Sequence, residues 1–269
     1  MRLNRKAYRI FPSAMFCLRS FIICILLHLL CIPARAQNQS DSSFIRNYTK
    51  DVGRYISSPY HWNGKEWLTF AGIATTSAVM MHLDAEVHEF ISDNRDGGMG
   101  GFSKQFLEPF GNGAFSLPVI AALGGYGLIT RQKEHIHIAG AGFEAFAFSA
   151  GLATAFKWGV QRHRPNDDIS HDPFHFEGPM GNERDNGSFV SRHAATSFAL
   201  ATVLASTYGH KRKWISWVSY GLAGAVTVSR VHNGNHWFSD AFAGAALGFF
   251  TGKFVVRMNR DRNVAAFRD

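Results

Sequence analysis

Six long apolar stretches dominate the sequence and restrict the folds that the chain can adopt. They cover residues 67–83, 115–130, 138–156, 193–208, 214–229 and 237–257. Each stretch is rich in Ala, Gly, Phe and Leu and is long enough for a helix rather than a strand. The pattern therefore predicts an all-α fold, a six-helix bundle in which the groups that carry chemistry gather at one end.

The first 36 residues have the features of a secretory signal peptide. Basic residues precede an apolar segment from Phe21 to Ile32, and Ala34-Arg35-Ala36 has the small-x-small pattern of a cleavage site. All 3 cysteines lie before residue 37, so the mature chain is predicted to have neither a disulfide nor a thiol nucleophile. We expect an N-terminal arm over residues 37–66, a helical domain over 67–258 and a basic tail over 259–269.

The signal segment also holds most of the excess positive charge. It contains six Lys and Arg residues and no acidic residue, so its removal lowers the formal charge from +8 to +2. A nearly neutral mature chain gives no support for nucleic-acid binding.

Two polar blocks lie where predicted helices end and begin. Lys157 and Arg164 are seven residues apart and would share one helix face if the helix continued to Pro165. Ser191 is expected to cap the next helix, where backbone N–H groups can hold an anion beside His193. Taken separately, the first block could be a pair of cations at a helix C-terminus, and the second a serine cap with an incidental histidine.

A third block surrounds the turn predicted at Asn233-Gly234. His236 and Asp240, four residues apart, would share a helix face, and the carboxylate could accept a hydrogen bond from one ring nitrogen. The other nitrogen would then be a nucleophile or base, although the same spacing is typical of surface and capping pairs. Arg230 offers a planar set of donors that fits phosphate oxygens. Cations and N–H donors of this kind suit phosphoryl transfer without a metal.

The three blocks together resemble the signature of a known superfamily. Lys157-x6-Arg164-Pro165, Ser191-x-His193 and Ser229-Arg230-x5-His236-x3-Asp240 are similar to the motifs of the type 2 phosphatidic acid phosphatase/vanadium haloperoxidase superfamily. The resemblance covers residues 157–240, and the six apolar stretches are similar to the helical core of the lipid-phosphatase branch.

The resemblance implies a role for each motif residue. His236 would attack phosphorus, Asp240 would orient it, and His193 would protonate the leaving oxygen and later activate water. No metal and no other cofactor is implied. The implied phosphate ligands are Lys157, Arg164, Ser191 and Arg230. Arg192 stands where the family usually has Gly; it could hinder close approach of the backbone to phosphate, or add a cation for a larger anionic headgroup.

Other polar residues point less clearly to a site. The spacing of one acidic and histidine-rich cluster matches no standard metal site, so we expect a solvated loop there. We expect Glu144 to pair with a polar group or face water, and Asp84 and Arg95 to be structural. The cluster comprises Asp167, Asp168, His171, Asp172 and His175.

The basic segments 131–134, 211–213 and 257–262 would be cytoplasmic under the positive-inside rule. A cleaved signal followed by six spans would put the catalytic blocks on that same side, so one of these assumptions must fail. We expect a cell-envelope enzyme that faces the periplasm, either inserted in the bilayer or lying on its surface.

The resemblance favours a metal-independent phosphatase that acts on a membrane lipid through a phosphohistidine. Its substrate would be a phosphomonoester or pyrophosphate, such as a phosphatidate, an isoprenyl carrier or a lipid A headgroup. The alternatives are a periplasmic acid phosphatase for soluble phosphomonoesters, a vanadate-dependent haloperoxidase and a non-enzymatic bundle that binds phosphate headgroups.

Overall fold

The computed structural model describes residues 41–94, 101, 103–166, 172–181, 187–210 and 212–266. The predicted signal peptide lies outside these residues. Residues 46–269 form one compact unit, and the description below concerns its described part. Apart from an isolated bridge between Arg162 and Phe176, the regular structure in these ranges is helical, which confirms the predicted all-α class.

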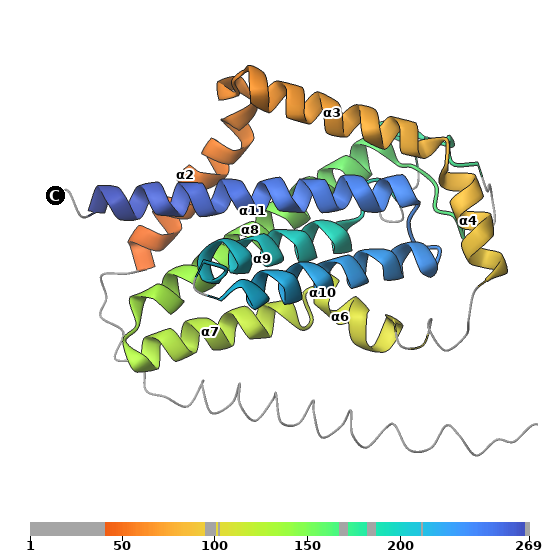
Figure 1. Ribbon diagram of the computed structural model, residues 1–269. Coiled ribbons are helices and arrows are strands. Elements are labelled where there is room, and N and C mark those ends of the chain that lie inside the picture. The colour runs from red at the N-terminus through yellow and green to blue at the C-terminus, as the bar shows by residue number, and fades with distance from the viewer. Residues whose placement is uncertain are drawn as a thin grey trace, which may run out of the picture. The chain divides into compact units, whose positions relative to one another are not determined.

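Each of the six apolar stretches forms a helix (Figure 1). These helices are α3 (Gly64–Met81), α7 (Ser116–Thr130), α8 (Lys133–Val160), α9 (Arg192–Tyr208), α10 (Lys213–His232) and α11 (Phe238–Ala266). The structure adds α2 (Asp41–Ser57), α4 (Asp84–Asp93) and α6 (Glu108–Gly111), with short turns at Ser58–His61, Ser103–Leu107 and Gly178–Met180. The described chain therefore has more helices than the six that were predicted.

Local signals in the sequence account for several helix ends. Asn63 and Glu66 form a reciprocal capping box at the start of α3, in which each side chain accepts a backbone N–H of the other residue. Ser191 caps α9 as predicted, because its Oγ accepts from the N–H of Ala194 at 3.4 Å. Gly234 has a φ of +66°, which confirms the turn predicted after α10.

Helix α9 lies at the centre of the bundle, packed against α8, α10 and α11 (Figure 1). Glycines at every fourth position of α11 allow the closest of these contacts. A Cβ atom on Gly244, Gly248 or Gly252 would clash with the backbone oxygen of Ser191, Ala195 or Ala199, at the N-cap and in the first turns of α9. Any larger residue at these positions would force the two helices apart, so the glycine stripe sets the distance between α11 and α9.

Large apolar side chains cover parts of the outer surface. Trp67 on α3 and Trp214 and Trp217 on α10 are 49%, 58% and 80% exposed. Two helices, Lys133–Val160 and the segment Phe238–Arg260 of α11, are long and apolar enough to cross a membrane. A third crossing is reached if the bent pair Gln105–Gly111 and Ser116–Thr130 counts as one span. Exposed apolar surface of this kind favours contact with lipid.

Candidate active site

The first predicted block is divided between the end of α8 and an extended segment. Helix α8 ends at Val160, because Gln161 takes a left-handed conformation (φ 46°) and its N–H bonds to the carbonyl of Lys157. The prediction that Lys157 and Arg164 share one helix face was therefore wrong. Lys157 is buried in the last turn, where its Nζ donates to the carbonyl of Gly187, and Arg164 follows four residues after the helix end.

Residues 161–163 form a short antiparallel ribbon with residues 175–177. The N–H of His163 bonds to the carbonyl of His175 at 3.1 Å, and the N–H of Glu177 bonds to the carbonyl of Gln161 at 3.1 Å. Arg162 and Phe176 are directly opposite each other within this ribbon. The pairing is why the chain leaves the helical path before it reaches Arg164.

The second block lies at the N-terminus of α9. Ser191 is buried, and its backbone N–H donates to the carbonyl of Asp240 at 3.1 Å, which joins this helix start to that of α11. His193 in the first turn lies so close to α6 that a Cβ atom on Gly111 would be 2.7 Å from its ring. The free N–H groups of a helix start make this a favourable place for an anion.

His236 lies just before α11, and its ring is held by a backbone group. Nδ1 of His236 lies 2.8 Å from the carbonyl oxygen of Ser188. A carbonyl can only accept, so Nδ1 must carry the proton, and in the neutral ring Nε2 keeps its lone pair. This hydrogen bond gives the ring the tautomer required of a nucleophile or base.

Asp240 does not fill the place predicted for it beside His236. Helix α11 begins at Phe238, so His236 and Asp240 do not share a helix face. One carboxylate oxygen of Asp240 lies 2.6 Å from Nη1 of Arg162, and the other accepts the N–H of Trp237 at 3.1 Å. The prediction that Asp240 accepts a hydrogen bond from His236 is therefore wrong, and the carbonyl of Ser188 accepts it instead.

Arg162, which the sequence motifs do not include, links Asp240 to a distant helix. Nη2 of Arg162 lies 2.7 Å from Asp84 at the start of α4, and Nη1 also donates to the Oγ of Ser239 at 2.8 Å. Asp84 in turn accepts the backbone N–H of Ser239 at 2.9 Å. We call these four residues, Asp84, Arg162, Ser239 and Asp240, the arginine clamp; all are buried, which agrees with the expectation that Asp84 is structural.

The candidate ligands for phosphate converge around the two histidines. We call Lys157, Arg164, Arg230, His193 and His236 the cationic cup. Burial and then the charges of Lys157, Arg164 and Arg230 lower the pKa of His236 well below its usual 6.5. Burial and then the same cations, together with Arg192, lower the pKa of His193 to about 3. Both rings are therefore neutral when no anion is bound.

Three polar atoms of the cup are buried without a hydrogen-bond partner in the described part of the chain. These are Nε2 of His193 and Nε and Nη1 of Arg230. Arg230 has one carboxylate beside it, since its Nη1 lies 3.2 Å from Glu108, whose side chain is 34% exposed. Unpartnered buried polar atoms beside several cations are the features expected of a site for an anion.

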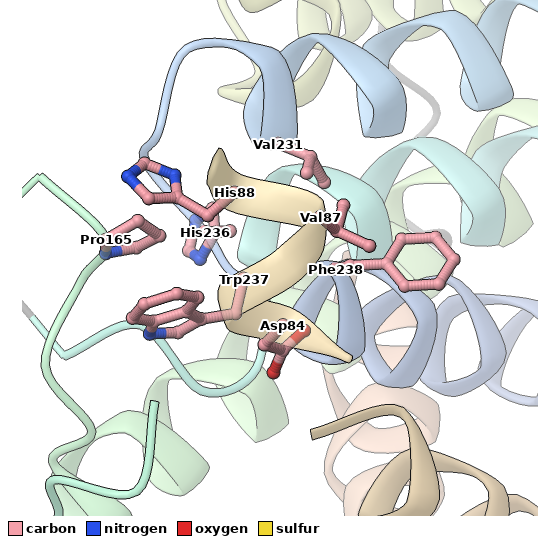
Figure 2. Close-up of a pocket in the computed structure, with 8 residues that line it drawn as sticks. All are labelled: Asp84, Val87, His88, Pro165, Val231, His236, Trp237 and Phe238. Carbon is pink, nitrogen blue, oxygen red and sulfur yellow. The ribbon is translucent and has the colours of Figure 1, made fainter. Parts of the chain in front are cut away.

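A small pocket reaches His236 from the side of α4 (Figure 2). Figure 2 shows Trp237 and Pro165 beside His236, with His88 of α4 on the same side. Among the described residues that line this pocket, none is a cation of the cup. The pocket and the predicted phosphate ligands therefore share His236 but no cation.

The remaining predictions concern residues outside the cup. Glu144 is buried and accepts a hydrogen bond from Asn259 at 2.8 Å, which confirms the expected polar pairing. Arg95, Asp167, Asp168 and His171 lie outside the described residues. His175 belongs instead to a group with His163 and Glu177, which the sequence pattern did not indicate.

Comparison with known proteins identifies the helical region that contains this site. The PAP2 superfamily model matches residues 141–263, a segment that holds all three motif blocks. A crystal structure of a transmembrane PAP2-type phosphatidylglycerolphosphate phosphatase from Bacillus subtilis shares the fold, with a TM-score of 0.52. The likeness covers 71% of this chain and 96% of that one at 15% identity.

A curated relative is also similar over most of this chain. It is the lipid A 1-phosphatase of Porphyromonas gingivalis, which is 26% identical over 246 residues. The alignment covers 87% of this chain and 49% of the relative, so the chain spans about half the length of that protein.

Proposed function

We propose that this protein is a phosphatase that removes a phosphate group from a membrane lipid without a metal at the reacting phosphorus. The observation that carries the proposal is the cationic cup, in which Lys157, Arg164 and Arg230 surround an unprotonated Nε2 of His236. The match of residues 141–263 to the PAP2 superfamily model supports phosphoryl chemistry. The candidate membrane helices and the lipid A 1-phosphatase relative support a lipid substrate.

In the proposed reaction, Nε2 of His236 attacks phosphorus while the bond from phosphorus to the lipid oxygen breaks. His193 donates a proton to the departing oxygen, which leaves a phosphohistidine and a lipid alcohol. His193 then accepts a proton from water, the water oxygen attacks phosphorus, and the bond to Nε2 breaks to release inorganic phosphate. The cations and the N-terminus of α9 balance the charge on the phosphoryl oxygens throughout.

His193 must be protonated for the first step, although its pKa in the folded chain is about 3. The charges of Arg230, Arg192, Lys157 and Arg164 contribute to this low value. A bound phosphate dianion offsets these charges, so substrate binding raises the pKa of His193. Substrate therefore helps to produce the acid that its own cleavage requires. Asp240 acts at a distance, because it holds Arg162 and the start of α11 next to His236.

The test is phosphate release by the purified chain in detergent. Phosphatidate, an isoprenyl diphosphate, lipid A and p-nitrophenyl phosphate would be compared at equal concentrations. The control is His236→Asn, because an asparagine amide can keep the hydrogen bond to Ser188 while the nucleophilic nitrogen is lost. Activity should fall at least about 10⁴-fold in this variant. A chain that releases phosphate from none of these compounds is not a phosphatase of this kind.

Two further outcomes refine the proposal. If p-nitrophenyl phosphate is cleaved and the lipids are not, the protein is a phosphatase for soluble esters. Rapid quenching with ³²P-labelled substrate should leave an acid-labile, alkali-stable label on the wild type and none on His236→Asn. Turnover with no label under conditions that trap the intermediate would contradict the covalent step.

A further inference from the structure

The polar face of the ribbon carries a group of side chains that the proposed phosphatase reaction does not use. Because side chains alternate along a strand, the ribbon of residues 161–163 and 175–177 has two different faces. Arg162 and Phe176 occupy one face, where the guanidinium lies 5.5 Å from the centre of the ring. His163, His175 and Glu177 occupy the other face.

The pairing of the two strands brings these three side chains together. His163 lies opposite His175, and their rings stack with centres 4.0 Å apart. Glu177 is the diagonal neighbour of His163, with its Oε1 2.9 Å from Nε2 of that ring. One nitrogen of each histidine and one oxygen of Glu177 all lie within 4.8 Å of one another.

We propose that His163, His175 and Glu177 bind one divalent transition-metal ion, and that zinc is the best match. Two imidazole nitrogens and one carboxylate oxygen are ligands that zinc accepts, with a fourth position left for water. Calcium and magnesium prefer sites made of oxygen atoms, so the two histidines select against them.

Two adjustments of the side chains are required to form the site. Two ligand atoms on a tetrahedral zinc ion are about 3.3 Å apart, given metal–ligand bonds near 2.0–2.1 Å. The contact between His163 and Glu177 therefore has to open by a few tenths of an ångström. His175 must rotate out of the stack so that its nitrogen points at the ion, and it is only partly buried. His163 is almost completely buried and already oriented by the ribbon.

The position of the site suggests what a bound ion would do. His163 directly precedes Arg164 of the cationic cup, and its carbonyl accepts from the Oγ of Ser188 at 3.0 Å and from Nε1 of Trp237 at 2.7 Å. An ion held across the ribbon would fix this strand and so stabilise the wall of the cup. Its role would be structural, since His163 and Glu177 are not among the groups proposed to contact phosphorus.

Metal content provides a test that does not depend on phosphatase activity. The full chain, with any purification tag removed, would be stripped with a chelator, loaded with zinc and washed, and its zinc measured by mass spectrometry. We expect one zinc per chain, a higher thermal midpoint on loading, and visible absorption typical of tetrahedral coordination when cobalt(II) replaces zinc. Zinc retained at well below one per chain would overturn the proposal.

Matched variants locate the ion. His175→Ala and Glu177→Gln should each lose the zinc and the rise in thermal midpoint, whereas His61→Ala, an exposed histidine elsewhere, should keep both. Glu177→Gln is nearly isosteric, so its helical circular dichroism should match the wild type and exclude misfolding as the cause. If both ribbon variants retain one zinc per chain, the ion binds elsewhere and the proposed site is wrong.

Discussion

Arg162 and Arg230 are both buried arginines near carboxylates, yet the structure uses them differently. In the arginine clamp, all three nitrogens of the Arg162 guanidinium donate hydrogen bonds. The acceptors are the carbonyl of Pro173 and the side chains of Ser239, Asp240 and Asp84. In the cationic cup, Nε of Arg230 has no partner within the described chain. A guanidinium whose nitrogens all donate to the protein holds the structure together. One with an unpartnered nitrogen remains able to bind a ligand.

The comparison also explains how the clamp supports the cup. Asp84 belongs to α4, outside the segment that matches the PAP2 superfamily, yet it accepts the N–H of Ser239 at the start of α11. Arg162 connects Asp84 to Asp240 and lies 5.4 Å from the ring of Trp237, the neighbour of His236. The clamp thus fixes the helix start that follows the proposed nucleophile, without a contact to phosphate.

The largest effect should come from breaking the clamp. Arg162→Met keeps much of the side-chain volume but leaves Asp84 and Asp240 buried without their cation. We expect a loss of about 3–5 kcal/mol in the free energy of unfolding, as for other broken buried ion pairs. Thermal or denaturant unfolding in detergent would measure it, and Arg257→Met, which removes an exposed arginine of α11, is the control.

An Arg162→Met variant as stable as the Arg257→Met control would contradict the structural role given to the clamp. Activity would fall in the Arg162 variant as well, but only as a consequence of the altered helix start. The unfolding measurement is therefore the one that decides.

Arg230 should show the opposite division between activity and stability. In Arg230→Ala, kcat/KM should fall about 10²–10³-fold, the usual cost of losing one donor to a developing oxyanion. Its thermal midpoint should change much less than that of Arg162→Met, because Nε of Arg230 has no partner to lose and its ion pair is with the partly exposed Glu108. Arg230→Lys keeps the charge without the planar set of donors and should lie between Ala and the wild type.

Phosphate release and thermal unfolding, measured on the same preparations, would test this division. Arg230→Ala could instead destabilise the protein as much as Arg162→Met while kcat/KM, calculated for the folded fraction, stayed at the wild-type value. Arg230 would then be a second structural arginine. The contrast between the clamp and the cup would then be lost.

The cup should also make the protein sensitive to acid. The pKa of His193 is about 3 in the folded chain and near 6.5 when unfolded, so between these values the unfolded state binds more protons. Stability should therefore decrease as the pH falls from about 6.5, and His236, whose pKa is also lowered, adds to the effect. Bound inorganic phosphate offsets the cations, so it should weaken this dependence.

Thermal midpoints from pH 7.5 to 4.5, with and without phosphate, would reveal the effect. His193→Gln removes one of the two titrating groups and should flatten the curve. A wild-type midpoint that stays level or rises toward pH 4.5 would mean that neither histidine is held neutral by the cup.

The helices could be predicted from the sequence because their apolar stretches are long and continuous. The residues at which α8 ends and α11 begins, next to the candidate site, could not be predicted. The end of α8 at Val160 depends on pairing between residues 161–163 and 175–177, and the start of α11 at Phe238 depends on Asp84. Both are contacts between segments distant in sequence, so spacing alone incorrectly placed Arg164 and His236 on helices.

The motif residues could be identified because a family resemblance connects three separate blocks. Their partners could not, because nothing in one sequence relates Arg162 to Asp84, which lies 78 positions earlier. One signal was present: Arg162 adds a second cation two residues before Arg164, immediately after an apolar helix. A charge so close to a predicted core is expected to have a buried partner.

Arg192 is the motif position where sequence and structure together predict the smallest effect. It is exposed at the first position of α9, and its charge contributes to the low pKa of His193 from the rim of the cup. It differs from both Arg162 and Arg230 because it is exposed rather than buried. An exposed charge contributes roughly 0.2–1 kcal/mol, so Arg192→Gly should change kcat/KM by about fivefold or less.

The direction of that change decides between the two roles open to Arg192. If Arg192 holds a second anionic group, Arg192→Gly should lower kcat/KM for a lipid diphosphate more than for a lipid monophosphate. If its side chain hinders phosphate, both values should rise, because glycine lets the backbone approach more closely. Unchanged values for both substrates would mean that Arg192 has neither role and that Lys157, Arg164 and Arg230, the cations of the cup, act without it.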